Sequence, residues 1–257
     1  MNSTQTLTLP DGRKALQKTN HTAPAGFFEA EAAGLSALAD SDFRIPEVID
    51  VTDRSIVMEY IESGRPDAAA WEAAGEALAR LHRHSRDEFG FHCDTYCGDS
   101  HQDNRCQRDG FRFYREQRYG PQIRRARDAG LVDRHEVTQL ERIAERLRDW
   151  VPEQEPALLH GDLWSGNLMF DERKRPVLID PASYQGWPEA DLAMTHAFGG
   201  FDKRFYQAYE SVNPLPAGFS ERVELYNLYH WLNHLNLFGG MYHGQVAEGI
   251  RRFGSAS

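Results

Sequence analysis

A dense polar cluster, HGDLWSGN at residues 160–167, stands between two short apolar runs of the chain. Asp162 precedes Asn167 by five positions, and Asp180 follows Asn167 by thirteen, at the end of the run VLID. An aspartate can accept the proton of an attacking hydroxyl, while an asparagine and a second aspartate are oxygen ligands for Mg²⁺, which bridges nucleotide phosphates. A loop followed by a hairpin places three such groups around one point. The cluster therefore predicts phosphoryl transfer, with Asp162 as base and Asn167 and Asp180 as metal ligands.

The competing interpretation of this cluster is purely local, because Asp, Asn and Gly are common turn formers and Asp180 could simply close a strand. The spacing of Asp162 and Asn167 is that of a kinase catalytic loop. His160, Trp164 and Asp180 accompany that spacing within one short stretch, which favours the catalytic interpretation. We expect His160 to brace the loop by hydrogen bonding rather than to transfer protons.

The composition is that of an ordinary soluble globular protein: 257 residues, 40% hydrophobic and 26% charged. A net charge of −10, from 29 basic and 39 acidic residues, argues against general nucleic-acid binding, because an acidic surface repels phosphate backbones. No apolar run approaches the length of a membrane span, and the opening residues do not have the pattern of a secretory signal. We therefore expect no membrane partner.

The cysteines are odd in number, which argues against a disulfide framework and favours a reducing cytoplasm. They are Cys93, Cys97 and Cys106, with His92 and His101 nearby in the sequence. These five residues could ligate zinc, but they form no paired C-x₂-C arrangement. The spacing therefore disfavours a zinc site.

The elements that must position the cluster form two lobes. Strands are expected at residues 5–9, 14–19, 45–51 and 55–60, around one helix at 28–38. Helices are expected from a cap at Asp67, over 111–129, over 134–149 and from 189 onwards, with short strands at 157–159 and 177–179. This order predicts an α+β protein with a small sheet-rich N-lobe (residues 1–61) and a larger, mostly helical C-lobe (62–257).

Two motifs, HGDLWSGN and LIDPASYQGWPEADLAM, resemble the fructosamine kinase (ketosamine 3-kinase) family. That family belongs to the wider aminoglycoside phosphotransferase and choline kinase group, which has a protein-kinase-like fold. Further similar segments, in the family's order, are LQKTN, FFEAEAAGL, IPEVI, FGF, CGDSHQDN, FGGFDKRFYQAY and LYHWLNHLNLFGG, and they extend from about residue 13 to 245. The resemblance implies an enzyme that uses ATP and Mg²⁺ to phosphorylate the 3-hydroxyl of a ketosamine, free or protein-bound, which makes the adduct unstable and permits deglycation.

The resemblance also implies roles on the nucleotide side. Lys18 in LQKTN matches the strand lysine that holds nucleotide phosphates, and Glu31 in FFEAEAAGL matches the helix acid that pairs with it. Such a pair makes physical sense, because a carboxylate fixes a flexible ammonium where phosphate charge must be neutralised. Glu29 is a rival partner that lies on a different helix face.

Residues 58–61 resemble a kinase hinge. Backbone groups of Glu59, Tyr60 and Ile61 would bond adenine, whereas the alternative is an edge strand that runs into a loop.

The resemblance also implies which residues lie near the sugar substrate that accepts the phosphoryl group. Trp164 would lie beside the sugar, unless it is a core tryptophan, and Gln102 and Asn104 in CGDSHQDN would help to shape the substrate side. Asp191 in PEADLAM is expected to anchor the lobe by capping a helix rather than to touch substrate. Four arginines, at positions 118, 124, 125 and 127, are expected to form a solvated helix face.

The chain departs from the family pattern at two places. Only seventeen residues precede Lys18, with Gly12 as their sole glycine, so we expect the glycine-rich phosphate loop to be missing, through a late start or a lost lid. The run Gln185-Gly186-Trp187-Pro188 also differs from the family's, which leaves the shape of the substrate pocket open. Two alternatives therefore remain: a kinase for another hydroxyl, such as an aminoglycoside, choline or a sugar, and a nucleotide-binding protein without turnover. A monomer is favoured.

Overall fold

The computed structural model describes residues 2–254, which begin with a four-stranded antiparallel sheet in the order β1-β2-β4-β3. The strands and the helix of this part are β1 (Ser3–Thr8), β2 (Lys14–Thr19), α1 (Phe27–Leu38), β3 (Val48–Thr52) and β4 (Ser55–Glu59). A small apolar core joins the helix to the sheet and includes Phe28 and Leu35 of α1 and Ile56 and Met58 of β4. All four expected strands and the helix are present, with the third strand shifted three residues along the chain at its start.

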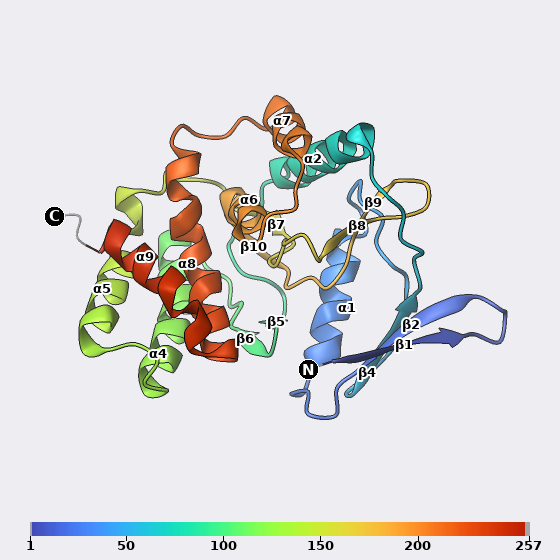
Figure 1. The fold of residues 1–257 in the computed structure, drawn as a ribbon, viewed down its shortest axis with the longest axis horizontal. Helices are drawn as coiled ribbons and strands as arrows, with labels where there is room; N and C mark the ends of the chain where they lie inside the picture. The colour runs from blue at the N-terminus through green and yellow to red at the C-terminus, as the bar shows by residue number, and fades with distance from the viewer. Residues whose placement is uncertain (1, 255–257) are drawn as a thin grey trace.

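The tip of the β1–β2 hairpin is a tight turn. The amide of Leu9 donates to the Arg13 carbonyl at 2.8 Å, and Gly12 has a φ of 85°, which a glycine adopts without strain. Figure 1 shows this turn at the outer end of the sheet, away from the rest of the molecule. Gly12 therefore serves the hairpin turn.

The remaining residues form a mostly helical part, linked to the sheet by residues 60–67. Its helices are α2 (Ala68–Arg83), α3 (Gly110–Phe113), the π-helix η1 (Tyr114–Tyr119), α4 (Gly120–Asp128), α5 (Arg134–Glu145), η2 (Leu147–Asp149), α6 (Pro188–Ala197), α7 (Lys203–Val212), α8 (Phe219–Phe238), η3 (Gly240–Tyr242) and α9 (His243–Phe253). Asp67 caps α2 as expected, by accepting from the Ala70 amide at 3.0 Å. The mixed α+β organisation is confirmed.

Three short antiparallel strand pairs lie within this helical part. They are β5 (Thr95–Cys97) with β6 (Ser100–Gln102), β7 (Ala157–Leu159) with β10 (Tyr184–Gly186), and β8 (Leu168–Phe170) with β9 (Pro176–Leu178). In Figure 1 the β7–β10 pair lies between α1 and helix α8, and the β8–β9 pair is drawn above α1, toward the N-terminal sheet. The segments 160–167 and 180–183, which connect these strands, are thus placed where the two parts of the molecule meet.

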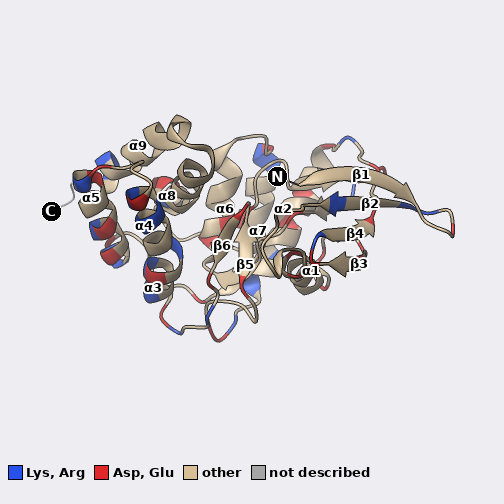
Figure 2. Ribbon diagram, turned by 90° about the horizontal axis from the view of Figure 1, so that it is seen from below, with Lys and Arg blue, Asp and Glu red and all other residues tan. Residues whose placement is uncertain are grey.

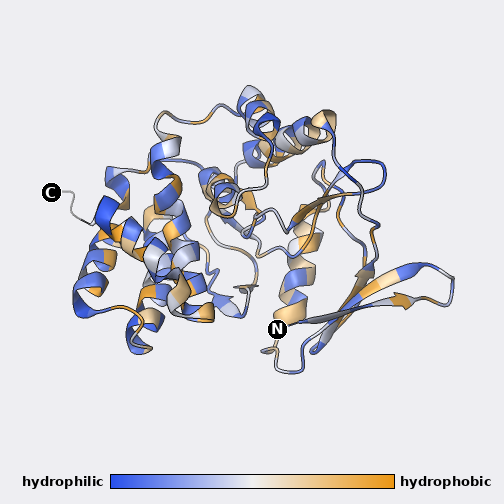
Figure 3. Ribbon diagram, in the orientation of Figure 1, coloured by the Kyte–Doolittle hydropathy of each residue, from blue (hydrophilic) through white to orange (hydrophobic). Residues whose placement is uncertain are grey.

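Apolar side chains hold the helical part together. Leu78 of α2 packs in one large cluster with Phe205 of α7, Leu192 of α6 and Leu232 of α8, all of them buried. Figure 3 shows hydrophobic residues recurring on the inner sides of these helices. Among the described residues, no helix combines the length and the apolar composition that a membrane span needs.

The expected solvated arginine face is wrong at one position. Arg124, Arg125 and Arg127 of α4 are exposed, and Figure 2 shows basic and acidic residues interspersed along α3 to α5. Arg118 is fully buried. It lies in η1, whose wider turn alters the helical phase and directs the side chain inward. Its guanidinium donates to the Asn104 side chain at 2.6 Å and stacks 4.0 Å from the centre of the Tyr184 ring, so an amide and an aromatic face meet the charge in place of a carboxylate, although Nε has no partner among the described residues.

Candidate active site

A cavity of about 200 Å³ lies where the sheet and the helical part meet, and residues of both line it. Lys18, Glu31, Asp162, Asn167 and Asp180 all contribute to its wall. Other lining residues are Asn2, Phe27, Tyr96, Gly98, Trp164 and Pro181. The structure thus brings together the five polar residues that the sequence singled out for phosphate, metal and proton chemistry.

The nucleotide-side wall contains a buried ion pair. The ammonium of Lys18 on β2 donates to a carboxylate oxygen of Glu31 on α1 at 2.6 Å, and both side chains are almost fully buried. Glu29, the rival partner, is exposed. Lys18 also contacts the Asp180 carboxylate. Burial opposes the charge of the ammonium, but the charges of Glu31 and Asp180 prevail and raise the pKa of Lys18, so it remains a cation that can meet phosphate.

Asp162, the candidate base, and Asn167, a candidate metal ligand, are held together within the loop 160–167. The side-chain amide of Asn167 donates to the backbone carbonyl of Asp162 at 2.8 Å and to its carboxylate at 3.3 Å. Because the nitrogen of Asn167 points at Asp162, its Oδ1 is the atom available to a cation. Burial first, and the charges of Asp180 and Asp191 next, raise the pKa of Asp162 to about 7. A carboxylate with a pKa near neutrality suits a general base.

Backbone pairing brings Asp180 to the same point. The amide of Ile179 donates to the carbonyl of Asn167 at 3.1 Å, so the two metal-ligand candidates leave neighbouring ends of the β8–β9 pair. Asp180 itself has a φ of 55°, a left-handed conformation that is uncommon outside glycine. Such backbone strain clusters at functional sites, where the surrounding structure imposes it.

His160 braces the loop, as expected for a structural histidine. It is fully buried, and burial lowers its pKa, so the imidazole is neutral. Its Nε2 lies 2.9 Å from the carbonyl of Ile179, and its Nδ1 accepts from the amide of Asp162 at 3.3 Å. The ring therefore ties the base segment to the Asp180 segment.

Asp191 anchors the same loop, but not in the expected way. It lies in the first turn of α6, where its carboxylate accepts the backbone amides of His160 at 2.7 Å and Gly161 at 2.8 Å. The expectation that Asp191 caps a helix is corrected: it caps the catalytic loop from a neighbouring helix. Gly161 has a φ of 84°, and a Cβ there would lie 2.1 Å from the Ala182 carbonyl, so only glycine fits this close approach.

Trp164 stands at the edge of the cavity with 38% of its surface exposed, so it is not a core tryptophan. A Cβ at Gly166 would meet its indole ring at 2.3 Å, so this glycine leaves room for the ring over the loop. The ring makes an edge contact with half-exposed Phe198, at 5.8 Å between centroids. The indole therefore offers a face to a ligand in the cavity.

Gln102 and Asn104 are buried behind the wall rather than exposed on it. Gln102 donates to the Tyr229 hydroxyl at 2.7 Å, and Asn104 donates to the Thr95 hydroxyl at 2.8 Å. They fix the β5–β6 hairpin, whose Tyr96 lines the cavity together with Gly98. Any influence of these two amides on a substrate is therefore indirect.

The hinge candidates lie at the end of β4. The amides of Glu59 and Tyr60 are bonded to the carbonyls of Glu47 at 2.8 Å and Lys14 at 3.3 Å, and the Glu59 carboxylate pairs with Arg44. None of the three hinge residues lines the 200 Å³ cavity. Their use in adenine binding stays a prediction, and it would have to employ carbonyl groups or the Ile61 amide.

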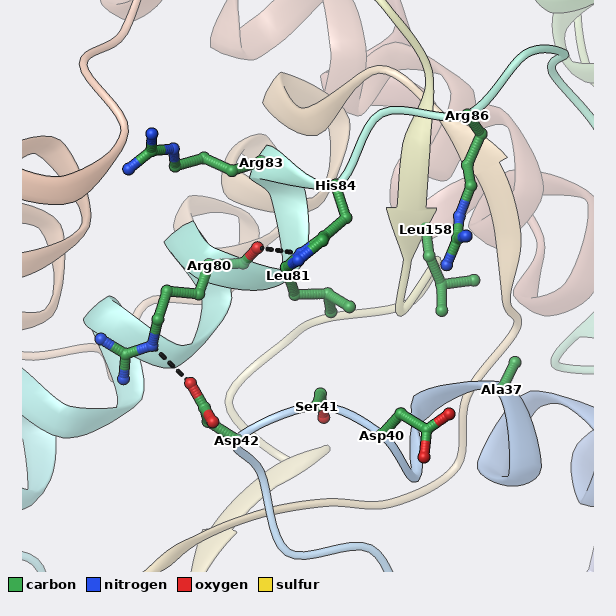
Figure 4. A pocket seen from close by; sticks show the side chains of 10 residues that line it. All are labelled: Ala37, Asp40, Ser41, Asp42, Arg80, Leu81, Arg83, His84, Arg86 and Leu158. Carbon is green, nitrogen blue, oxygen red and sulfur yellow. Dashed lines mark hydrogen bonds and ion pairs between the residues drawn. The ribbon is translucent and has the colours of Figure 1, made fainter.

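A larger cavity, of about 590 Å³, lies behind α1 and carries no comparable chemistry (Figure 4). Arg80 pairs there with Asp42, His84 contacts the Arg80 carbonyl at 2.8 Å, and none of the residues considered for phosphate, metal or proton chemistry lines this cavity. The smaller cavity is therefore the candidate active site.

The sequence did not point to several residues around this site. Phe27 and Tyr96 line the cavity, and their ring centroids lie 5.1 Å apart. An aromatic residue in a helix or a hairpin is common, so nothing in the sequence indicated that these two would lie at the site. Cys97 and His230 approach Asp162 from β5 and α8. Only the repeated His230 and His234 in the apolar helix 219–238 could have drawn attention to that wall.

A buried Lys18–Glu31 pair between sheet and helix α1, facing one loop with Asp162 and Asn167 and a second with Asp180, defines a kinase-like phosphotransferase. The fold agrees with that of a solved aminoglycoside phosphotransferase with ADP bound, at a TM-score of 0.61 and 16% identity, over 99% of this chain and 94% of that one. At this low identity the likeness shows the fold alone.

The family follows from closer relatives. Residues 1–255 match the family model described as fructosamine kinase. A probable ketoamine kinase of Synechocystis is 38% identical over 95% of this chain and 84% of its own length, and the chloroplastic protein-ribulosamine 3-kinase of Arabidopsis thaliana is 38% identical over 88% and 71%. A solved Thermobifida fusca structure, assigned as a fructosamine-3-kinase, superposes with a TM-score of 0.91 at 34% identity, over 100% of this chain and 94% of that one. The chain belongs to the fructosamine kinase family, whose kinase activity requires a phosphoryl donor such as ATP.

Proposed function

We propose that the protein transfers the γ-phosphoryl group of ATP to a sugar hydroxyl of a ketosamine, the 3-hydroxyl in the family to which it belongs. The observation that carries the proposal is the convergence of Lys18, Asp162, Asn167 and Asp180 on one cavity with an exposed tryptophan at its edge. Relatives described as ketoamine and ribulosamine kinases support the choice of acceptor. Phosphorylation at this position would destabilise the adduct, so the physiological role would be deglycation.

Mg²⁺ fits the donor set of the site. Oδ1 of Asn167 and the carboxylate of Asp180 are hard oxygen ligands of the kind that Mg²⁺ prefers. In this structure the Asp180 carboxylate contacts the Lys18 ammonium. These two residues would hold the ion, which when bound neutralises charge on the nucleotide phosphates. Lys18, kept in place by Glu31, would meet the phosphates from the sheet side.

Asp162 would orient the acceptor hydroxyl and take its proton as the oxygen attacks phosphorus. Its raised pKa keeps it competent near neutral pH, because about half of the carboxylate is ionised where the pH equals a pKa of about 7. The exposed face of Trp164 would support the sugar ring, since aromatic faces pack well against the C–H faces of sugars. The sugar would thus be held with one hydroxyl toward Asp162.

The decisive experiment measures ATP consumption with Mg²⁺, with and without fructosyl-lysine or ribulosyl-lysine. Turnover that depends on the ketosamine and disappears in Asp162→Asn supports the proposal. An aminoglycoside, choline and free fructose belong in the same panel, because preferred turnover of any of them would assign another acceptor. Bound ATP without turnover of any acceptor would favour a nucleotide-binding protein instead, an alternative that the family match and the assembled site do not favour.

We further propose a reducing, cytoplasmic setting and a monomer. The three cysteines are free, and the thiol of Cys106 is exposed, which a reducing environment tolerates. Sedimentation with reductant tests whether the protein is a monomer. Disulfide-linked dimers that form through the exposed thiol when the reductant is removed would show that the monomer needs a reducing environment.

A further inference from the structure

Three side chains of the kind that bind transition metals meet at the base of the candidate active site. Cys97 ends β5, Asp162 belongs to the catalytic loop, and His230 lies in the middle of α8. One ligand atom of each lies within 4.8 Å of the others. Cys97 is 2% exposed and His230 4%, whereas Asp162 borders the cavity. The fold thus assembles a sulfur, a nitrogen and an oxygen donor that are 65 and 68 positions apart in sequence.

One ring nitrogen of His230, the buried Nδ1, lacks a hydrogen-bond partner among the described residues. Buried polar atoms in native proteins nearly always have a partner, and an exception points to a missing ligand or ion. Burial first, and the nearby His234 next, lower the pKa of His230 to about 3, so the ring is in the neutral form that binds metals.

We propose that Cys97, Asp162 and His230 form a binding site for a thiophilic divalent cation of the Zn²⁺ type, and that occupation of this site blocks the catalytic aspartate. A Cys, His and carboxylate set is typical of Zn²⁺, whereas Mg²⁺ takes oxygen ligands and competes poorly for a sulfur. Three protein ligands leave a fourth position for water, on the side where Asp162 borders the cavity. Binding of the cation needs no redox change: a metal–sulfur bond forms and the Cys97 thiol releases its proton to solvent.

The geometry requires only a small closure. Ligand atoms around one Zn²⁺ lie about 3.5 Å apart, given metal–ligand bonds of about 2.0 to 2.3 Å, so donors that lie within 4.8 Å of one another need to approach by at most about 1.3 Å. Gly98 follows Cys97 directly in the turn between β5 and β6, and its φ of 59° is tolerated best by glycine. Asn233 already orients the sulfur by donating to Cys97 Sγ at 3.4 Å.

This site differs from the zinc cluster that the cysteine spacing disfavoured. Only Cys97 is common to both sets, and the exposed Cys106 provides a matched control. The inhibitory consequence rests on the proposed role of Asp162 as base, but metal binding itself does not. The two can therefore fail separately.

The first experiment uses Co²⁺ as a spectroscopic probe on the full chain without nucleotide. We expect a thiolate-to-Co²⁺ charge-transfer band and strong visible bands of a four-coordinate ion. Cys97→Ser should lose the charge-transfer band, Cys106→Ser should keep it, and His230→Asn should weaken binding at least tenfold. Thermal unfolding of each variant shows that it is folded at the temperature of the titration, and Cys97→Ala substitutes for Cys97→Ser if the latter is not.

The second experiment titrates Zn²⁺ into the ketosamine kinase assay with Mg²⁺ and ATP in large excess. Inhibition competitive with the ketosamine, and shifted at least tenfold by His230→Asn but not by Cys106→Ser, supports the proposal. Co²⁺ spectra without a thiolate band, or a band that survives Cys97→Ser, would overturn the site. A thiolate band without inhibition of an active enzyme would overturn the blocking role, whereas wild-type enzyme that turns over no ketosamine would overturn the proposed function and leave the metal site standing.

Discussion

The substitution Asp162→Asn should abolish turnover and at the same time stabilise the fold. The carboxylate lies in a nearly buried position and faces the charges of Asp180 and Asp191. Its hydrogen bonds from Asn167 do not compensate for this environment. Asparagine keeps the shape of the side chain but carries no charge, so the unfavourable desolvation disappears.

The size of this stabilisation follows from the difference in the pKa of Asp162 between the folded and the unfolded chain. An unfolded aspartate titrates near 3.8, whereas Asp162 in the fold titrates at about 7. Between these values the folded protein holds a proton that the unfolded chain has released, so its stability falls as the pH rises, by about 1.4 kcal/mol per pH unit. Relative to a neutral isostere, the carboxylate therefore lowers the free energy of unfolding by up to about 2 kcal/mol at pH 5 and about 4 kcal/mol at pH 8.

The assay is urea unfolding of wild type and Asp162→Asn at pH 5 and pH 8, without metal or nucleotide. The variant should be more stable at both values, and its advantage should be about 2 kcal/mol larger at pH 8. Asp202→Asn is the control, because the partly exposed Asp202 carboxylate accepts from the Arg204 amide, and this hydrogen bond outweighs desolvation and lowers its pKa. An advantage that is independent of pH, or a variant less stable than wild type at pH 8, would refute the argument that Asp162 is a destabilised base.

Three further outcomes are expected. Glu31→Gln should raise the KM for ATP about tenfold, equivalent to about 1.4 kcal/mol, because Lys18 loses its buried partner, whereas the exposed Glu29→Gln should not; kinetics at varied ATP check this. The kcat/KM for the ketosamine should fall as the pH drops below about 7, since only ionised Asp162 accepts a proton, and a flat profile from pH 5 to pH 8 would contradict its role. Trp164→Ala should raise the KM for the ketosamine about tenfold and leave that for ATP unchanged, and an equal change in both would mean that the tryptophan supports the loop rather than the sugar.

Local signals explain what could be predicted from the sequence. The strand at Lys14–Thr19 follows from the Asp11-Gly12 turn signal after an alternating run, and the cap at Asp67 follows from side-chain capping, both of which act over a few residues. It could be predicted that three side chains meet at one point, those of Asp162, Asn167 and Asp180. The chain runs from a loop through a hairpin to a second loop within 19 residues, which returns it to the same place. The Lys18–Glu31 pair bridges two elements, and the choice between Glu31 and Glu29 needed the helix face, which the resemblance supplied.

Contacts between distant segments account for what the sequence did not indicate. Whether Arg118 faces solvent depends on a π-helical turn that shifts the helix by one residue, and composition carries no sign of it. Gln102 and Asn104 look like pocket residues in a polar loop, but the hairpin turns them toward Tyr229 and Thr95. Side-chain direction is decided by packing partners that are far away in sequence.

The surroundings of Asp162 connect the proposed function with the proposed metal site. Burial and neighbouring charges raise the pKa of the Asp162 carboxyl to about 7, so its ionised form lowers the free energy of unfolding. A cation that binds this carboxylate would offset that unfavourable electrostatic energy. In the proposed catalysis this electrostatic energy would be recovered only in part, because Asp162 would take a proton from a hydroxyl and pass it on. A cation held also by Cys97 and His230 would recover it fully and would not leave with the product. The environment that would make this aspartate a competent base would therefore also make it the point at which the proposed thiophilic metal inhibits the enzyme.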